Sequence, residues 1–112
     1  MKNAEKLYKS LADANRLRIL KMLEVKPMCG CGVSHVLEIV QSAVSRHLKL
    51  LEDAGLVVRE REGSYVLYSL NPHPASKMVS AQLELIRSNF NEEELVKEDK
   101  SKAVRIDLCD FE

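Results

Sequence analysis

The chain has 112 residues, 46% of them hydrophobic and 30% charged, and its 17 basic residues balance its 17 acidic residues. This length suits one domain with a modest core and excludes two domains. No apolar run approaches the roughly 20 residues that a membrane-spanning helix needs, so no membrane partner is expected. The beginning of the sequence shows no apolar segment followed by a cleavage site, which predicts a cytoplasmic protein.

The balanced total charge conceals an uneven distribution along the chain. Residues 1–51 hold nine Lys or Arg and four Asp or Glu, whereas residues 71–112 hold six and nine. Nucleic-acid-binding domains usually carry net positive charge, so the total argues mildly against DNA binding and the basic first half argues for it.

Two amphipathic helices are predicted at the start of the chain. Apolar residues recur at three- and four-residue spacing over residues 4–11 and again over residues 17–23. Either Asp13 or Asn15 can cap the second helix, because both side chains offer an oxygen acceptor.

The next two predicted helices form a pair joined by a tight turn. Proline and glycine residues interrupt the chain after the second helix, and residues 33–40 then predict a short third helix. A fourth helix of about twelve residues follows from Gln41 and ends at Gly55, since glycine favours the backbone angles of a helix end. Such a pair is typical of helix-turn-helix proteins.

The second half of the chain changes from helical to strand patterning and back. Residues 56–62 and 64–70 are rich in β-branched and aromatic residues, which predicts a β-hairpin. Residues 78–90 return to helical spacing. We therefore predict one domain over residues 1–92 and a flexible C-terminal tail over residues 93–112.

The outward face of the fourth helix carries side chains suited to DNA. Because Val44, Leu48 and Leu51 form its apolar stripe, the polar residues between them should face outward. Serine hydroxyls and the N–H groups at a helix N-terminus can bind phosphate oxygens. Arginine can form bidentate hydrogen bonds with the edge of a guanine base. Judged by charge alone, a solvated helix face explains these residues as well as DNA binding does. The candidate DNA-binding residues are Gln41, Ser42, Ser45, Arg46 and Lys49 on this helix, and Arg59 and Arg61 in the hairpin.

Three consecutive stretches resemble, in order and spacing, the motifs of the ArsR/SmtB family of winged helix-turn-helix repressors: LYKSLADANRLRILKML, QSAVSRHLKLLEDAGLV and REGSYVLYSLNPH. The resemblance covers about residues 7–73. It implies a mostly α-helical fold with a β-hairpin wing, working as a homodimer on palindromic double-stranded operator DNA. It also adds His47 to the DNA-binding residues. Where Val40 stands the family usually has a polar capping residue, so Gln41 or Ser42 is expected to cap the recognition helix.

The stretch MCGCGVSH places two of the three cysteines one residue apart. Inside a helix, successive side chains rotate by about 100°, so Cys29 and Cys31 would point to nearly opposite sides. Gly30 and Gly32 make this stretch an easily reshaped helix start in which the thiols can converge. The sequence therefore predicts that ligand binding and local unwinding occur together, and two buried hydrophobic thiols are the alternative.

The resemblance extends to the arsenic-responsive branch of the family, which carries a Cys-x-Cys core before the recognition helix. It implies that Cys29 and Cys31 bind As(III) or Sb(III), soft ions that take a pyramidal set of thiolates. Ser34 stands where the branch has its third cysteine, so Cys109 is expected to supply the third thiolate, from its own or the partner subunit. A solvated thiol of no consequence is the alternative for Cys109.

The predicted function is a repressor that binds its operator without a cofactor and dissociates when it binds the metalloid ion. Two alternatives share this architecture: a sensor of thiophilic Cd(II) or Pb(II), and a redox sensor whose cysteines oxidise, although their short ring disfavours a stable disulfide. The zinc site that the family builds from Asp and His on its last helix has no counterpart in residues 75–91. No nucleophile with a placed base and no phosphate loop is present, so an enzyme is not expected.

Overall fold

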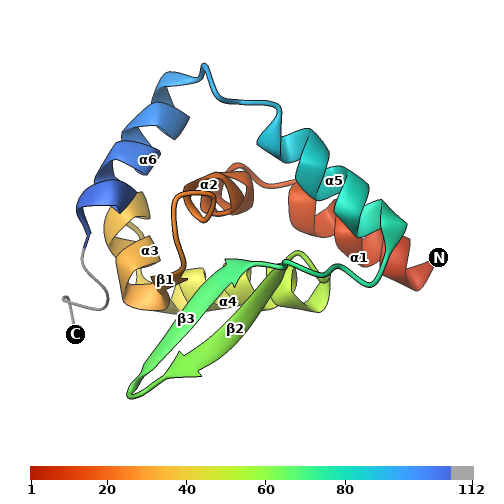
Figure 1. Cartoon of the computed structure of the whole chain (residues 1–112), viewed down its shortest axis with the longest axis horizontal. Helices are drawn as coiled ribbons and strands as arrows, with labels where there is room; N and C mark the ends of the chain where they lie inside the picture. The colour runs from red at the N-terminus through yellow and green to blue at the C-terminus, as the bar shows by residue number, and fades with distance from the viewer. Residues whose placement is uncertain (107–112) are drawn as a thin grey trace.

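The structure is a computed structural model that describes residues 1–106, which form six helices and a small three-stranded antiparallel sheet at the edge of the molecule (Figure 1). Figure 1 shows α2 in the middle, with α3 and α6 on one side and α1 and α5 on the other. None of these helices has the length and apolar character needed to cross a membrane. The elements are α1 (Lys2–Leu11), α2 (Ala14–Met22), β1 (Met28–Cys29), α3 (Gly30–Leu37), α4 (Gln41–Asp53), β2 (Val57–Glu62), β3 (Tyr65–Leu70), α5 (Lys77–Arg87) and α6 (Glu94–Arg105).

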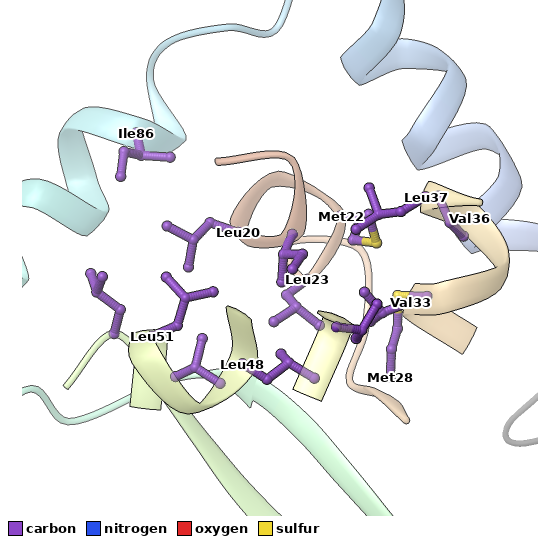
Figure 2. Close-up of a cluster of buried hydrophobic side chains, with 14 of the residues drawn as sticks. Leu20, Met22, Leu23, Met28, Val33, Val36, Leu37, Leu48, Leu51 and Ile86 are labelled. Atoms are coloured by element: carbon purple, nitrogen blue, oxygen red, sulfur yellow. The ribbon is translucent and has the colours of Figure 1, made fainter. Parts of the chain in front are cut away.

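The hydrophobic core lies where α2, α3 and α4 meet. The predicted stripe on α4 is confirmed: Val44, Leu48 and Leu51 are all buried. Burying a side chain of this size contributes about 1.5–3 kcal/mol, so the stripe fixes which face of α4 points inward. Figure 2 shows these leucines among core side chains from α2, α3 and α5, including Leu20, Leu23, Val33, Val36 and Ile86.

The predicted helix-turn-helix and hairpin are confirmed, and two helix boundaries in the domain follow from identifiable residues. Asp13 caps α2, since its Oδ1 accepts a hydrogen bond from the backbone N–H of Arg16 at 3.0 Å. Gly55 follows α4 with a φ of +82°, a conformation that disfavours any residue with a Cβ. The chain can therefore turn directly from α4 into β2.

The sheet contains a third strand that the sequence does not predict. Strand β1 pairs with β3 on the side away from β2, with Met28 opposite Tyr68 and Cys29 opposite Leu67. A strand of two residues is too short to show any periodicity. This pairing attaches the cysteine segment to the hairpin.

Other helix boundaries differ from the prediction. Helix α3 ends at Leu37, not at residue 40, and Glu38 after it has a φ of +58°. Helix α3 begins at Gly30, inside the segment where we expected the helix to be interrupted. It can begin there because Cys29, the residue before it, acts as the N-cap.

Helix α5 ends at Arg87, and Phe90 lies beyond it with a φ of +67°. Polar side chains end α5 here: Ser88 and Asn89 both donate hydrogen bonds to carbonyls of its last turn.

The prediction of a flexible tail from residue 93 is wrong for residues 94–105, which form α6. This helix packs against α2 and α3. Its charged side chains are partly directed inward: Asp99 is 1% exposed and accepts hydrogen bonds from Arg18 at 2.8 and 3.0 Å. Lys100 pairs with Glu24 at 2.8 Å. A charged sequence therefore forms a docked helix, because its charges meet opposite charges on α2 and in the turn that follows α2.

A buried lysine joins α5 to α2. The ammonium group of Lys21, on α2, donates hydrogen bonds to the Ile86 carbonyl and to Asn91 Oδ1, each at 2.9 Å. It also pairs with Glu24 at 2.9 Å. An unpaired charge would be costly in the interior, and these partners offset that cost.

The docking of α6 can be tested by replacing its buried carboxylate. We expect Asp99→Ala to lower the free energy of unfolding by about 1.5–3 kcal/mol, the contribution of hydrogen bonds to a charged group. Urea denaturation followed by circular dichroism measures this. The control is Glu98→Ala, an exposed neighbour on the same helix, which should change stability by less than about 0.5 kcal/mol. Equal effects would mean that α6 does not depend on the Arg18–Asp99 pair.

Candidate functional site

The outward face of α4 carries the polar residues that the sequence predicts for DNA contact. Gln41, Ser42, Ser45, Arg46 and Lys49 are all exposed, while the stripe opposite them is buried. The structure therefore brings these five residues together on one accessible surface. Helix α3 and the tight turn after it support this surface from behind, as in other helix-turn-helix units.

The start of α4 has no side-chain cap. The prediction that Gln41 or Ser42 caps the helix is wrong, because both residues lie within its first turn. The N-cap is Val40, whose side chain has no hydrogen-bond acceptor. Only backbone bonds from Ala43 and Val44 to the Val40 carbonyl close this turn. The N–H groups at the start of α4 thus point outward, where they favour an anion such as phosphate.

The basic side chains of this surface differ in their surroundings. Lys49 forms an ion pair with Asp53 at 3.3 Å, and Arg59 of β2 forms one with Glu52 at 3.4 Å. Within residues 1–106, Arg46 makes no ion pair. Exposed pairs of this kind contribute little, so DNA phosphates can compete for these cations.

The hairpin presents its two predicted arginines on the same side of a strand. Arg59 and Arg61 are both exposed and lie two residues apart on β2. Side chains at this spacing point to the same face of a strand. The hairpin can therefore extend the basic surface beyond α4.

The structure sets His47 apart from the other predicted DNA-binding residues. Its side chain is half-buried, and its Nδ1 lies 3.1 Å from Nη1 of Arg16 on α2. The ring therefore faces a neighbouring helix, unlike the exposed side chain of Arg46 beside it.

The carboxylate of Asp13 lies beside the same arginine. Burial favours the neutral acid, but the hydrogen bond from the Arg16 N–H and the charge of the Arg16 guanidinium outweigh it, so the pKa of Asp13 is lowered. Asp13 therefore remains ionised while it caps α2 and pairs with the guanidinium at 3.9 Å.

The two neighbouring cysteines converge in the structure. Their Sγ atoms lie 2.7 Å apart, and Cys29 and Cys31 are 5% and 8% exposed. The predicted need for unwinding is wrong, because Cys29 lies before α3 in an extended conformation and only Cys31 belongs to the helix. Cys29 is the N-cap of α3, since its sulfur accepts a hydrogen bond from the Gly32 N–H at 3.4 Å.

The cysteine pair and the candidate DNA-binding face of α4 share one open hollow of about 590 Å³. Part of its wall comes from the first turns of α4 and part from the hairpin strand β3. Two further residues of β3, Tyr65 and Leu67, pack directly against the thiols. The lining includes Cys29, Cys31, Gln41, Ser45, Val66 and Tyr68.

The residues of β3 near the thiols are missing from the sequence prediction. Their closeness depends on the pairing of β1 with β3, for which the sequence holds no periodic signal. Arg16 also had no predicted role, although it lies within the first family-like stretch.

The end of α6 reaches the cysteine pair from the other side. A methyl group placed on Gly32 would lie 3.7 Å from the Cys29 sulfur and 3.7 Å from Cγ2 of Ile106. Lys26 also donates a hydrogen bond to the Ile106 carbonyl. Cys109, the predicted third ligand, lies outside the described residues. Within residues 1–106, no three His, Cys, Asp or Glu side chains are grouped so that they could hold a metal ion.

A helix pair with an exposed second helix, followed by a β-hairpin, defines a winged helix-turn-helix protein. Residues 13–58 match the family described as "Bacterial regulatory protein, arsR family". The chain is 33% identical over 84 residues to the arsenical resistance operon repressor of Bacillus subtilis (strain 168), covering 74% of this chain and 80% of that protein. The chain therefore belongs to the ArsR family of bacterial regulatory proteins.

Two further comparisons agree with this assignment. The arsenical resistance operon repressor of Escherichia coli (strain K12) is 41% identical over 68 residues, which cover 60% of this chain and 58% of that protein. Among solved structures, reduced HlyU from Vibrio cholerae N16961 is 35% identical with a TM-score of 0.65, covering 81% of this chain and 92% of that one.

The capping role of Asp13 leads to a prediction about acid stability. We expect Asp13→Ala to lower the free energy of unfolding by about 1 kcal/mol at pH 7. Because the folded pKa of Asp13 is lowered from 3.8, its ionisation stabilises the wild type above that value, and the gain is lost as the pH falls through the folded pKa. Urea denaturation between pH 7 and pH 2 should therefore show the two proteins becoming more similar in acid.

The control variant is Asp13→Asn, which keeps an oxygen acceptor at the cap but cannot ionise. Its stability at pH 7 should lie between those of the wild type and Asp13→Ala. A difference between wild type and Asp13→Ala that stays constant down to pH 2 would contradict the electrostatic part of the argument.

Proposed function

We propose that this chain is a transcriptional repressor that binds operator DNA and is released by trivalent arsenic or antimony. The observation that carries the proposal is the single hollow lined by both the cysteine pair and the first turns of α4. The relatives in B. subtilis and E. coli are named arsenical resistance operon repressors, which supports this class of signal. The protein would act in the cytoplasm, without catalysing a reaction.

The DNA-binding surface in this proposal is the outward face of α4 together with the hairpin. The first turn of α4 offers uncapped N–H groups and two serines to a phosphate, which positions the helix. Arg46 then reaches base edges in the major groove, with Gln41 beside it. Arg59 and Arg61 contact the neighbouring backbone, and DNA binding needs no cofactor.

A second copy of the chain is the proposed partner on DNA. Helices α1 and α5 lie side by side, with Gln82 donating a hydrogen bond to the Tyr8 hydroxyl at 3.4 Å (Figure 1). This pair exposes large apolar side chains, among them Tyr8, Met78 and Leu85. If the same surface of a second copy packed against it, the resulting dimer would place two recognition helices on one DNA duplex.

The chemistry of the cysteine pair supports a soft, trivalent ion as the inducer. Two sulfur atoms already lie 2.7 Å apart in a buried position, where a thiophilic ion could bridge them. A pyramidal site needs one more ligand, and we propose Cys109 of the same chain. Ile106 lies beside Gly32, and the three residues from there to Cys109 can span roughly 10 Å, enough to reach the pair.

Release from DNA would follow from the attachment of the cysteines to the hairpin. Cys29 is paired with Leu67 of β3, and Leu67 is paired in turn with Glu60 of β2. An ion that draws the thiolates toward a third ligand would shift β1 and, through this ladder, the hairpin. The same shift would alter the shared hollow and the start of α4, so that the basic surface no longer fits the operator.

The DNA-binding role of α4 can be tested with Arg46→Ala. We expect operator affinity to fall by about 1–3 kcal/mol, because a bidentate contact to a base edge is lost while the buried face of α4 is untouched. Fluorescence anisotropy with a labelled operator fragment measures this. Lys97→Ala, which removes an exposed cation from α6, is the control and should leave affinity unchanged. Equal affinity of Arg46→Ala and wild type would exclude this face of α4.

The sensor role can be tested with Cys29→Ser and Cys31→Ser. Serine keeps a capping acceptor at position 29 but is a poor ligand for a soft ion, so DNA binding should persist while arsenite-driven release is abolished. A mobility-shift assay with arsenite, antimonite, cadmium and peroxide measures release and separates the metalloid, divalent-metal and redox alternatives. Normal release of both variants by arsenite would show that the pair is not the sensor.

Cys109→Ser completes this series. If Cys109 is the third ligand, the ultraviolet sulfur-to-arsenic absorption and the arsenite affinity should both fall below those of the wild type. Equal titration curves would mean that Cys29 and Cys31 carry the signal with a small external ligand.

A further inference from the structure

Arg16 occupies a junction between three helices. Its Nε donates a hydrogen bond to the Ser10 carbonyl at 2.7 Å, and its Nη2 donates one to the Lys9 carbonyl at 3.1 Å. These bonds close the C-terminal end of α1. Its Nη1 lies 3.1 Å from Nδ1 of His47 on α4. One guanidinium, only 13% exposed, thus joins the end of α1, the first turn of α2 and the middle of α4.

This contact specifies which tautomer of the neutral histidine ring fits the structure. A guanidinium group has donors and no acceptor, so Nδ1 of His47 must accept the hydrogen bond from Arg16. The ring proton is then on Nε2. A doubly protonated ring would lose this bond and would bring a second positive charge against the guanidinium. The carboxylate of Asp13, 3.9 Å from Nη1 of Arg16, is the acidic group of this junction.

We propose that His47 is a positioning residue that holds α4 at a fixed angle to α1 and does not contact DNA. The neighbouring Arg46 is exposed, whereas His47 is half-buried against α2 and points away from the basic surface. Successive residues of a helix differ by about 100° in direction, so one of them can read DNA while the other anchors the helix.

The angle between α1 and α4 matters because α1 contributes to the proposed dimer surface. In a dimer, the two recognition helices must lie about 34 Å apart to enter successive major grooves. A change in the angle between α4 and α1 would occur in both subunits of the dimer. It would therefore change the distance between the two recognition helices. The Arg16–His47 contact would therefore determine which half-site spacing the protein accepts. This inference rests on the proposed DNA-binding dimer.

The test compares two variants that place an acceptor at different positions. In His47→Asn, Oδ1 is as many bonds from Cα as Nδ1 is in histidine, whereas in His47→Gln the amide lies one bond further out. The operator is obtained by selecting random-sequence DNA with the wild-type protein. Versions with one base pair inserted or removed between the half-sites are then made from it.

We expect His47→Asn to keep operator affinity within about twofold of the wild type. His47→Gln and His47→Ala should lose on the order of tenfold, as expected for one hydrogen bond to a charged group. These two variants should also discriminate less between the three spacings. Arg46→Ala is the matched control, because loss of a base contact weakens binding at all spacings alike. If His47→Ala does not fold, the difference in operator affinity between His47→Asn and His47→Gln still tests the inference.

Nitrogen NMR of the wild-type protein gives an independent readout, in which the His47 ring should carry its proton on Nε2. Three results would overturn the inference: a proton on Nδ1, equal losses in Asn and Gln variants, or an unchanged spacing preference in both Gln and Ala variants. Failure of the wild type to enrich any DNA would overturn the proposed function and this role with it, whereas the other results leave the proposed function standing.

Discussion

Helix α2 is enclosed by α1, α4, α5 and α6, so its charged side chains must find partners inside the protein. Each of its three cations is directed to a different neighbour. Arg16 binds the end of α1 and the middle of α4, Arg18 binds Asp99 of α6, and Lys21 binds the end of α5. Hydrophobic attraction has no defined direction, whereas these hydrogen bonds do. They therefore specify the arrangement on which both candidate sites depend.

The sequence predicts those parts of the fold whose signal is local. The stripe at Val44, Leu48 and Leu51 and the glycine at position 55 were enough to define α4 and its end. The sequence does not predict helix α6 because its charged residues resemble a solvated segment, and their partners, on α2 and in the turn after it, lie far away in the sequence. The candidate site shows the same division. The cysteines and the α4 residues are visible as motifs, but their meeting around one hollow depends on tertiary contacts.

The closeness of the two candidate sites has a thermodynamic consequence. If an ion at the cysteine pair lowers operator affinity by some factor, the operator must lower ion affinity by the same factor. In this structure that linkage needs no long pathway, since β3 contacts the thiols and belongs to the same hairpin as Arg59. The cysteine pair and the outward face of α4 are parts of one sheet-and-helix unit, so a small displacement would suffice to couple the two proposed sites.

The start of α4 has no side-chain cap, so its first-turn N–H groups lack a stabilising acceptor from a side chain at the N-cap. A serine or aspartate in place of Val40 would supply an acceptor to the first-turn N–H groups and strengthen the free protein. It would also compete with the phosphate that we expect there. Under the proposed function, valine at this position would leave the first-turn N–H groups of α4 available to a phosphate of the operator. The free repressor thus gives up some stability in exchange for a stronger dependence on its target.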